Sequence, residues 1–170
     1  MPSLDALNAL DRAGFVAVLG PLFEHSPWIA EATWERRPFT TIGALHDALV
    51  ATVTGATDTA QLALIRAHPD LAGKAARANT LTAESTREQA GAGLDQLTAE
   101  EYALFQRLNQ AYCEKFGFPF IICVRHHDKT SILAEFQRRL DLDPLAERRQ
   151  ALREIGEIAR IRLLDFCRQT

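Results

Sequence analysis

Apolar residues recur every three or four positions along most of the chain, a spacing typical of helices that bury one face. The clearest example follows Thr41, a good N-cap, and Gly55 stands behind it as a C-terminal stop. Its apolar positions are Ile42, Leu45, Leu49 and Val53. We therefore predict a helix that begins after Thr41 and buries this face.

The same signals predict helices over much of the remaining chain. Candidate N-caps are Asp11, Ser26 (followed by Pro27), Thr98 (in a capping box with Glu101) and Asp143 (followed by Pro144), and candidate stops are Gly20 and Gly117. An apolar helical run at 59–66 precedes His68. The predicted buried face of the last helix comprises Leu145, Leu152, Ile155, Ala159, Leu163 and Phe166.

Residues 118–124 interrupt the helical pattern, because they are continuously apolar and contain Pro119. Proline lacks an N–H and disfavours a helix interior, so we predict an extended, buried segment here. In an otherwise helical protein, the backbone N–H and C=O groups of such a segment have no neighbouring strand to bond. Something else must satisfy these groups, and a polar ligand is one candidate.

These elements predict an all-α fold: a single-domain bundle of about eight to nine helices with one extended apolar segment at 118–124. A chain of 170 residues is long enough for one domain with a substantial core, and 47% hydrophobic content is ordinary for a globular protein. The chain has no tandem repeat, low-complexity tract or long linker. We therefore expect residues 1–170 to form one domain.

Charge and composition narrow the range of partners. The net charge of −3 gives no electrostatic support to nucleic-acid binding, and no apolar run reaches the roughly 20 residues of a membrane span. The first residues lack the features of a signal peptide, so we expect a cytoplasmic protein. Cys113, Cys123 and Cys167 are accordingly expected to be reduced thiols. No residues have the spacing of metal ligands, so we expect no metal.

The residue best suited to proton chemistry is His68, which Pro69 follows at the end of the run 59–66. Proline disfavours helical geometry at the preceding residue, so the helix should end near His68. An imidazole there can act as a general acid or base at neutral pH. The alternative is structural: a histidine that interacts with the last carbonyl groups of the helix.

A second candidate group is the stretch Ser85-Thr86-Arg87-Glu88-Gln89. Ser85 and Glu88 have capping-box spacing, which predicts the start of a helix of small residues. The N-terminus of a helix also presents N–H groups to an anion. In a functional interpretation, Glu88 orients His68 or shares a proton with it, and Gln89 offers a paired amide donor and acceptor to a urea-like or imide-like substrate.

Arg162 lies in the last helix beside the apolar positions Ala159 and Leu163. The spacing leaves two interpretations open: a side chain that reaches solvent along apolar surface, or a guanidinium that holds a carboxylate through two parallel hydrogen bonds. Backbone groups of the segment that ends at Val124 are further candidates for lining a pocket. Arg125 follows that segment, and the sequence leaves its role open.

Three stretches together resemble the 2-oxo-4-hydroxy-4-carboxy-5-ureidoimidazoline (OHCU) decarboxylases. They are His-Pro-Asp-Leu-Ala-Gly-Lys at 68–74, Leu-Thr-Ala-Glu-Ser-Thr-Arg-Glu-Gln-Ala-Gly at 81–91 and Phe-Gly-Phe-Pro-Phe-Ile-Ile-Cys-Val-Arg at 116–125. The resemblance implies an all-helical carboxy-lyase of urate degradation that converts OHCU to (S)-allantoin and CO2. It also implies an enzyme that needs no metal or organic cofactor and forms a homodimer.

Carried onto this chain residue by residue, the resemblance makes His68 the catalytic acid/base and Glu88 its partner, while Arg162 holds an anionic or carbonyl group. The full set of expected substrate contacts is Pro69, Ser85, Thr86, Arg87, Glu88, Gln89, the backbone of Phe120, Ile121, Ile122, Cys123 and Val124, and Arg162.

Two other interpretations compete with this one. A non-catalytic helical interaction module would have no small polar pocket around His68 and no stereospecific effect on OHCU. A relative of the decarboxylases would use the same site on another ureido or imidazoline acid. Binding of allantoin beside His68 and Gln89 distinguishes the first of these from an enzyme.

Overall fold

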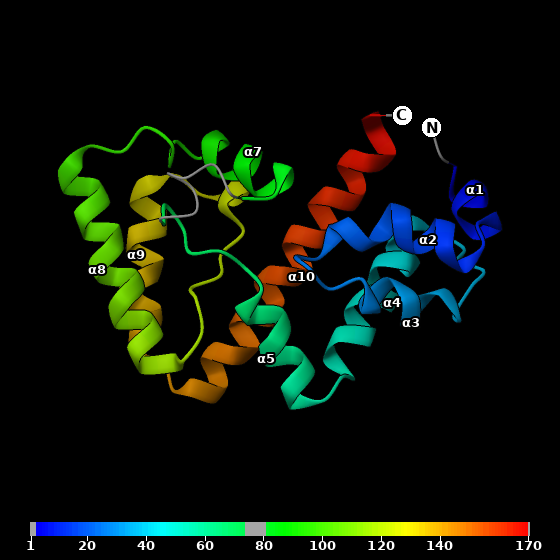
Figure 1. Cartoon of the computed structure of the whole chain (residues 1–170), viewed down its shortest axis with the longest axis horizontal. Coiled ribbons are helices and arrows are strands. Elements are labelled where there is room, and N and C mark those ends of the chain that lie inside the picture. Colours follow the sequence, from blue (N-terminus) through cyan, green and yellow to red (C-terminus); the bar gives the residue numbers. More distant parts are fainter. Residues whose placement is uncertain (1–2, 74–80, 170) are drawn as a thin grey trace. The chain divides into compact units, whose positions relative to one another are not determined.

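A computed structural model describes residues 3–73 and 81–169; Lys74, the last residue of the motif at 68–74, lies outside them. All regular structure in the described residues is helical, with nine α-helices and two short 3-10 helices (Figure 1). The predicted all-α fold is confirmed. Among the same residues, no single helix is long and apolar enough to cross a membrane; the helices Ile42–Thr54 and Asp58–Arg66 pass that test only as a pair, and the pair is bent by 111°.

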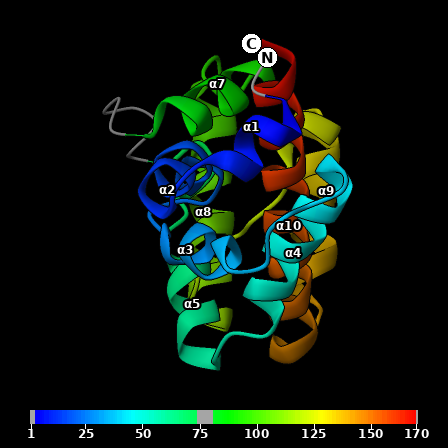
Figure 2. The same cartoon turned by 90° about the vertical axis from the view of Figure 1, so that its right-hand side faces the viewer.

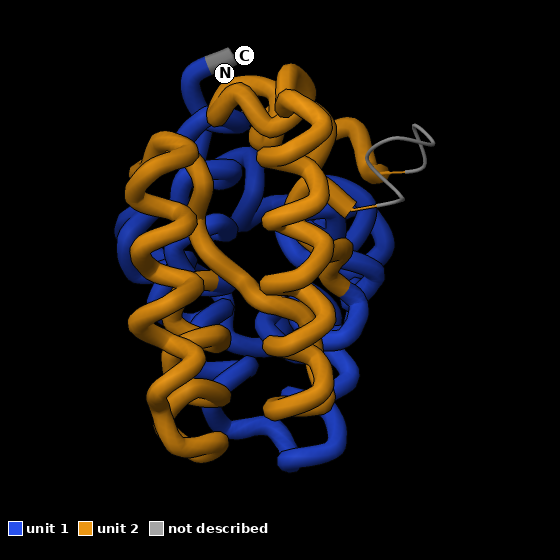
Figure 3. Tube along the Cα trace, turned by 90° about the vertical axis from the view of Figure 1, so that its left-hand side faces the viewer, with its two compact units in different colours: residues 1–67, 155–170 blue, residues 68–154 orange. Residues whose placement is uncertain are grey.

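The chain divides into two compact units, residues 1–67 with 155–170 and residues 68–154 (Figure 3). The first contains α1 (Leu4–Ala9), α2 (Arg12–Leu19), η1 (Gly20–Leu22), α3 (Trp28–Trp34), α4 (Ile42–Thr54) and α5 (Asp58–Arg66). In this unit α2 packs against α3 and α3 against α4 (Figure 2). Each of these helices buries apolar side chains, such as Phe15, Ile29 and Leu49. The expectation of a single domain stays a prediction.

The second unit carries most of the predicted site. It contains α7 (Ala83–Gly91), α8 (Ala99–Phe116), η2 (Val124–His126), α9 (Lys129–Leu140) and the start of α10 (Pro144–Gln169), which ends in the first unit. Residues 119–123 belong to no helix or strand, and Phe120, Ile121, Ile122 and Cys123 are each at most 3% exposed. The prediction of a buried segment that interrupts the helices is therefore confirmed for residues 120–123, but Val124, the last residue of the predicted extended segment, begins the 3-10 helix η2.

Most of the predicted helix boundaries are confirmed by their caps. The side chains of Asp11 and Thr41 each accept a backbone N–H in the first turn of their helices. Thr98 forms the predicted capping box with Glu101, and Gly117 ends α8 with a left-handed φ of 73°. These caps depend on residues three or four positions apart, so the local sequence is enough to predict them.

Two predicted caps are wrong. Pro27, not Ser26, is the N-cap of α3. At α7, the N-cap is Thr82, whose Oγ1 accepts the N–H of Ser85 at 3.3 Å. The helix therefore begins three residues before the predicted start, and Ser85 and Glu88 do not form a capping box.

The buried face of α10 also differs from the prediction. Leu145 is 54% exposed, and Leu152 and Phe166 are only half-buried. The predictions for Ile155, Ala159 and Leu163 are confirmed, and the other buried positions are Glu147, Ala151 and Arg162. The face is shifted because two of its members are charged residues that find partners inside the protein, which an apolar pattern does not reveal.

Candidate active site

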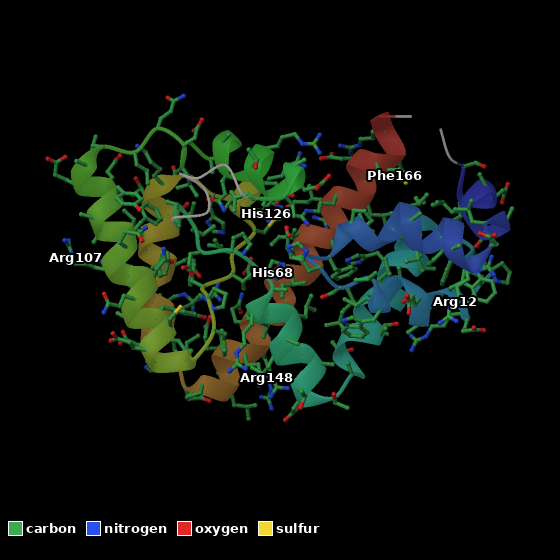
Figure 4. The ribbon with its side chains drawn as sticks, in the orientation of Figure 1. Arg12, His68, Arg107, His126, Arg148 and Phe166 are labelled. Atoms are coloured by element: carbon green, nitrogen blue, oxygen red, sulfur yellow. The ribbon has the colours of Figure 1, made fainter. Side chains whose placement is uncertain are left out.

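His68 lies just beyond α5, which ends at Arg66 with Ala67 as its C-cap (Figure 4). The prediction that the helix ends near His68 is confirmed. His68 is the first residue of the second unit and is 8% exposed. A histidine in this position combines the stiff backbone imposed by Pro69 with shielding from bulk solvent.

Three side-chain amides hold the loop that follows. Gln89 Oε1 accepts the N–H of Ala72 at 3.0 Å, and Gln106 Nε2 donates to the Ala72 carbonyl at 3.0 Å. Asn109 Nδ2 donates to the Leu71 carbonyl at 2.9 Å. Ala72 has a φ of 50°, a left-handed conformation that residues with a Cβ seldom adopt. The amides thus stabilise a strained loop conformation next to His68.

The turn of this loop is also tight. A Cβ added to Gly73 would lie 2.8 Å from the Cβ of Asp70 and 3.2 Å from its carbonyl oxygen. Side-chain carbons do not approach one another so closely, so the turn as it stands requires glycine at position 73.

Two titratable groups at this loop, the Asp70 carboxyl and the Cys113 thiol, have pKa values above their ordinary ones. Burial raises the pKa of the Asp70 carboxyl, although the residue as a whole is exposed. Burial, and secondarily the negative charge of Asp70, raises the pKa of the Cys113 thiol. This thiol therefore stays protonated at neutral pH and is a poor nucleophile. Cys113, Cys123 and Cys167 all lie outside disulfide bonds.

Helix α7 divides the predicted contacts between two faces. Ser85 and Gln89 are buried and Glu88 is half-buried, whereas Thr86 and Arg87 are exposed. The exposed side chains bond within the helix: Thr86 Oγ1 donates to the Thr82 carbonyl, and Arg87 Nη2 to Glu84. The structure thus separates Thr86 and Arg87 from the buried face of α7.

The structure changes the interpretation of two residues of α7, Gln89 and Glu88. Because the oxygen of Gln89 accepts from Ala72, the amide of Gln89 offers a substrate mainly its NH2 group, not the expected donor and acceptor together. Because Thr82 caps the helix, the structural explanation of Glu88 as a capping residue is wrong. Glu88 instead projects from the last half of α7, one turn beyond Ser85.

The segment 120–124 leads directly into η2, which packs against α7. Two of its backbone groups have side-chain partners: the Ile121 carbonyl accepts from Arg139 Nη1 at 2.7 Å, and the Cys123 N–H donates to Glu154 Oε2 at 2.9 Å. Within the described part of the chain, the backbones of Phe120 and Ile122 form no hydrogen bond, although both residues are almost completely buried. These are the groups to which a polar ligand would bond.

Arg162 belongs to the first unit. Its Nη2 donates to Glu24 Oε1 at 3.1 Å and its Nη1 to the Leu22 carbonyl at 3.4 Å. Both charged side chains are less than 10% exposed, so the interpretation of Arg162 as a side chain that reaches solvent is wrong. It is a buried guanidinium that already bonds one carboxylate.

Several residues around the site were not predicted. Gln106 and Asn109 are polar residues on the inward side of α8, among Phe105, Tyr112 and Phe116. Polar side chains at spacings of three and four within an apolar face were the signal that could have identified them. Asn109 Oδ1 is buried without a hydrogen-bond partner among the described residues. No group of three or more potential metal ligands occurs in the same part of the chain.

Comparison with known proteins identifies the family. The family model "OHCU decarboxylase" matches residues 8–164. The chain is 41% identical over 163 residues to the 2-oxo-4-hydroxy-4-carboxy-5-ureidoimidazoline decarboxylase of Haloferax volcanii, and the match covers 96% of this chain and 95% of that protein. It is 40% identical over 160 residues to the protein of the same name in Mus musculus, covering 94% and 90% of the two chains.

Two solved structures have a similar fold. A crystal structure of (S)-allantoin synthase matches with a TM-score of 0.78 and 31% identity over 96% of this chain; the chain spans about half, 54%, of that longer protein. A crystal structure of OHCU decarboxylase in the presence of (S)-allantoin matches with a TM-score of 0.66 and 20% identity, covering 85% and 93% of the two chains, a likeness of fold alone. The family model and the two full-length relatives show that the chain belongs to the OHCU decarboxylase family.

Proposed function

We propose that this chain converts OHCU to (S)-allantoin and CO2, with His68 as the general acid/base and Glu88 as its partner. The observation that carries the proposal is the hydrogen bond from the Ala72 N–H to Gln89 Oε1. It joins the loop that begins with His68 to the helix that carries Ser85, Glu88 and Gln89. Two motifs that lie apart in the sequence are thereby fixed to each other, as a shared site requires.

The chemistry that these residues must perform follows from the substrate. One ring carbon of OHCU bears a hydroxyl and a carboxylate, and the adjacent carbon forms a C=N bond. Loss of CO2 leaves an electron pair that forms a C=C bond between the two ring carbons, while the ring nitrogen takes up a proton. The hydroxyl then loses its proton and becomes a carbonyl, and the second carbon gains a proton. The substrate is its own electron sink, so the proposal requires no organic cofactor.

In this scheme His68 transfers the protons, and protonation from one face of the ring fixes the S configuration. The unpaired backbone groups of Phe120 and Ile122 provide donors and acceptors for the ureido and ring amide groups. The NH2 group of Gln89 adds a donor from α7. Apolar walls favour neutral CO2 over the charged carboxylate, which assists its departure.

The direct test is circular dichroism of OHCU freshly generated from urate by urate oxidase and hydroxyisourate hydrolase. The proposal predicts that the wild-type protein accelerates the appearance of the (S)-allantoin signal and leaves one enantiomer in excess. A racemic product formed at the uncatalysed rate would instead support the non-catalytic module. Acceleration with another ureido or imidazoline acid, but not with OHCU, would support the alternative substrate.

The role of Glu88 has its own test. Replacing Glu88 with glutamine keeps the size of the side chain but removes the charge that orients or shares a proton with the imidazole. We expect kcat to fall by about tenfold or more, with little change in the free energy of unfolding. Steady-state kinetics and urea denaturation measure the two quantities. Glu84→Gln, on the same helix, is the control, and a loss of stability alone would show that Glu88 is structural.

The proposed role of Arg162 is to hold an anionic or carbonyl group of the substrate while it also bonds Glu24. Lysine has one ammonium group and lacks the planar fork of arginine, so it cannot serve two partners in the same geometry. We expect Arg162→Lys to raise KM by about tenfold or more. Arg160→Lys, at an exposed ion pair with Glu157, should leave KM unchanged. An unchanged KM for Arg162→Lys would make Arg162 a structural residue.

We further propose a homodimer, which the family resemblance supports, and a location in the cytoplasm. Sedimentation equilibrium at micromolar protein concentration tests the first part, and cell fractionation tests the second. A single species of the mass of one chain, 18.9 kDa, would contradict the dimer.

A further inference from the structure

We infer that Arg139 and Glu154 are positioning residues for the decarboxylation: they hold the Ile121 carbonyl and the Cys123 N–H and thereby fix the backbone that lines the site. We call this pair of side chains the backbone clamp. The inference rests on the proposed function, because it assumes that the substrate bonds to the segment 120–124. It adds two residues to that site that do not themselves touch the substrate.

Arg139 is a fully buried charge at one end of the clamp. Its Nη1 donates to the Ile121 carbonyl at 2.7 Å, and its Nε donates to the two oxygens of Glu147 at 2.9 and 3.2 Å. Its guanidinium carbon lies 4.4 Å from the ring centroid of Phe120. One side chain therefore contacts two consecutive residues of the segment, a carbonyl by a hydrogen bond and a ring by a cation–π interaction.

The partners of Arg139 are themselves fixed. The Tyr112 hydroxyl donates to Glu147, and the Phe120 ring stacks on Phe136 with centroids 3.7 Å apart. A buried ion pair adds little net stability, because desolvation of the two charges offsets their attraction. Apolar side chains would fill this core equally well. What Arg139 adds is a directional bond to one particular carbonyl group.

Glu154 holds the other end of the clamp. Its Oε2 accepts the Cys123 N–H at 2.9 Å, and its Oε1 accepts from Gln150 Nε2 at 2.7 Å. Gln150 Oε1 in turn accepts from Arg153 Nη2 at 2.6 Å. The carboxylate is thus oriented by a chain of bonds along α10 and is aimed at a single backbone group.

Two sets of backbone groups in the segment matter for the clamp; the Cys123 and Val124 carbonyls belong to neither, because they accept the N–H groups of His126 and His127. The Ile121 carbonyl and the Cys123 N–H bond to the protein, whereas the backbones of Phe120 and Ile122, among the described residues, bond to nothing. The second set lies beside or between the clamped residues, so its position depends on them. Since misplacing substrate-binding groups by about 1 Å can cost up to about 10²-fold in rate, losing one end of the clamp should be measurable.

Glu154→Ala tests the clamp, because Glu154 is only half-buried and its loss should leave the protein folded. We expect kcat/KM for OHCU to fall by about tenfold or more, mainly through KM, since these backbone groups would bind substrate and transition state alike. The melting temperature should stay within a few degrees of the wild-type value. Glu157→Ala, three residues further along α10, should leave kcat/KM within about twofold.

A rescue variant separates positioning from charge. Exchanging the two side chains, with Gln150→Glu and Glu154→Gln together, keeps an oxygen for the Cys123 N–H, the bond between positions 150 and 154, and the net charge. We expect this double variant to recover kcat/KM to within about threefold of wild type. Amide hydrogen exchange should show the Cys123 N–H protected in wild type and in the exchange variant, and faster in Glu154→Ala.

An unchanged kcat/KM in Glu154→Ala, with faster exchange at Cys123, would overturn the inference, and so would a double variant that protects Cys123 but stays as impaired as Glu154→Ala. Neither result would affect the proposed function, since wild type would still form (S)-allantoin. If wild type itself fails to act on OHCU, the proposed function fails first, and the exchange data still show whether Glu154 holds the segment.

Discussion

Replacing His68 with asparagine is expected to lower kcat/KM for (S)-allantoin formation by about 10²–10⁴-fold, the contribution typical of general acid–base catalysis. Asparagine keeps a hydrogen-bonding side chain of comparable size, but it does not exchange a proton near neutral pH. The loop that follows is held by Gln89, Gln106 and Asn109, so its conformation should survive the change. Circular dichroism of freshly generated OHCU measures both the rate and the enantiomer formed.

The matched control for this variant is His126→Asn. His126 is an exposed histidine in the same unit, at the end of η2 (Figure 4). Its replacement should leave the rate within about twofold of wild type, as for most surface substitutions. Full activity in His68→Asn would refute the role of His68, whereas an equal loss in both variants would point to a general effect on the protein.

Replacing Arg139 with methionine should cause the largest loss of stability, about 3–5 kcal/mol. Methionine is about as long as the aliphatic part of the arginine side chain, but it leaves Glu147 as a fully buried carboxylate without its cation. The Ile121 carbonyl loses its donor as well. Urea denaturation monitored by far-ultraviolet circular dichroism gives the free energy of unfolding.

Two further variants test whether the loss of stability comes from the unpaired charge of Glu147. Arg138→Met, at the adjacent position but in an exposed pair with Glu135, should change the free energy of unfolding by less than about 1 kcal/mol. Combining Arg139→Met with Glu147→Leu should recover part of the loss, because no unpaired buried charge then remains. Equal stability of the Arg138 and Arg139 single variants would contradict the account of the buried pair.

The sequence predicted those parts of the fold that depend on near neighbours. The end of α5 before Pro69 and the capping box at Thr98 follow from residues within one turn of each other. The prediction of the start of α7 failed for the same reason: Thr82 and Ser85 are both good N-caps and lie within one turn of each other. The local pattern does not choose between two such starts, and the chain uses the earlier one, which adds nearly a turn to the helix.

Local sequence patterns do not predict ion pairs between residues that lie far apart along the chain. The sequence predicted no helix at α9, where Arg139 occupies a buried position that an apolar pattern assigns to a hydrophobic residue. Its partner Glu147 lies in a different helix, and the partner of Arg162 is 138 residues away. Charge burial of this kind becomes visible only when the elements are placed in space. The motif residues His68, Glu88 and Gln89 were identifiable, but Gln106 and Asn109, the other two amides that hold the loop, were not.

The close approach of Gly73 to Asp70 has a consequence for sequence variation. Any side chain at position 73 would push the turn open, and the displacement would be carried along the short loop to His68. At Gly91, by contrast, an added Cβ would meet no atom within 4 Å. In a library of single substitutions selected for activity, position 73 should therefore retain glycine alone, while position 91 accepts alanine. The correct placement of His68 would then depend in part on position 73, a residue that has no side chain.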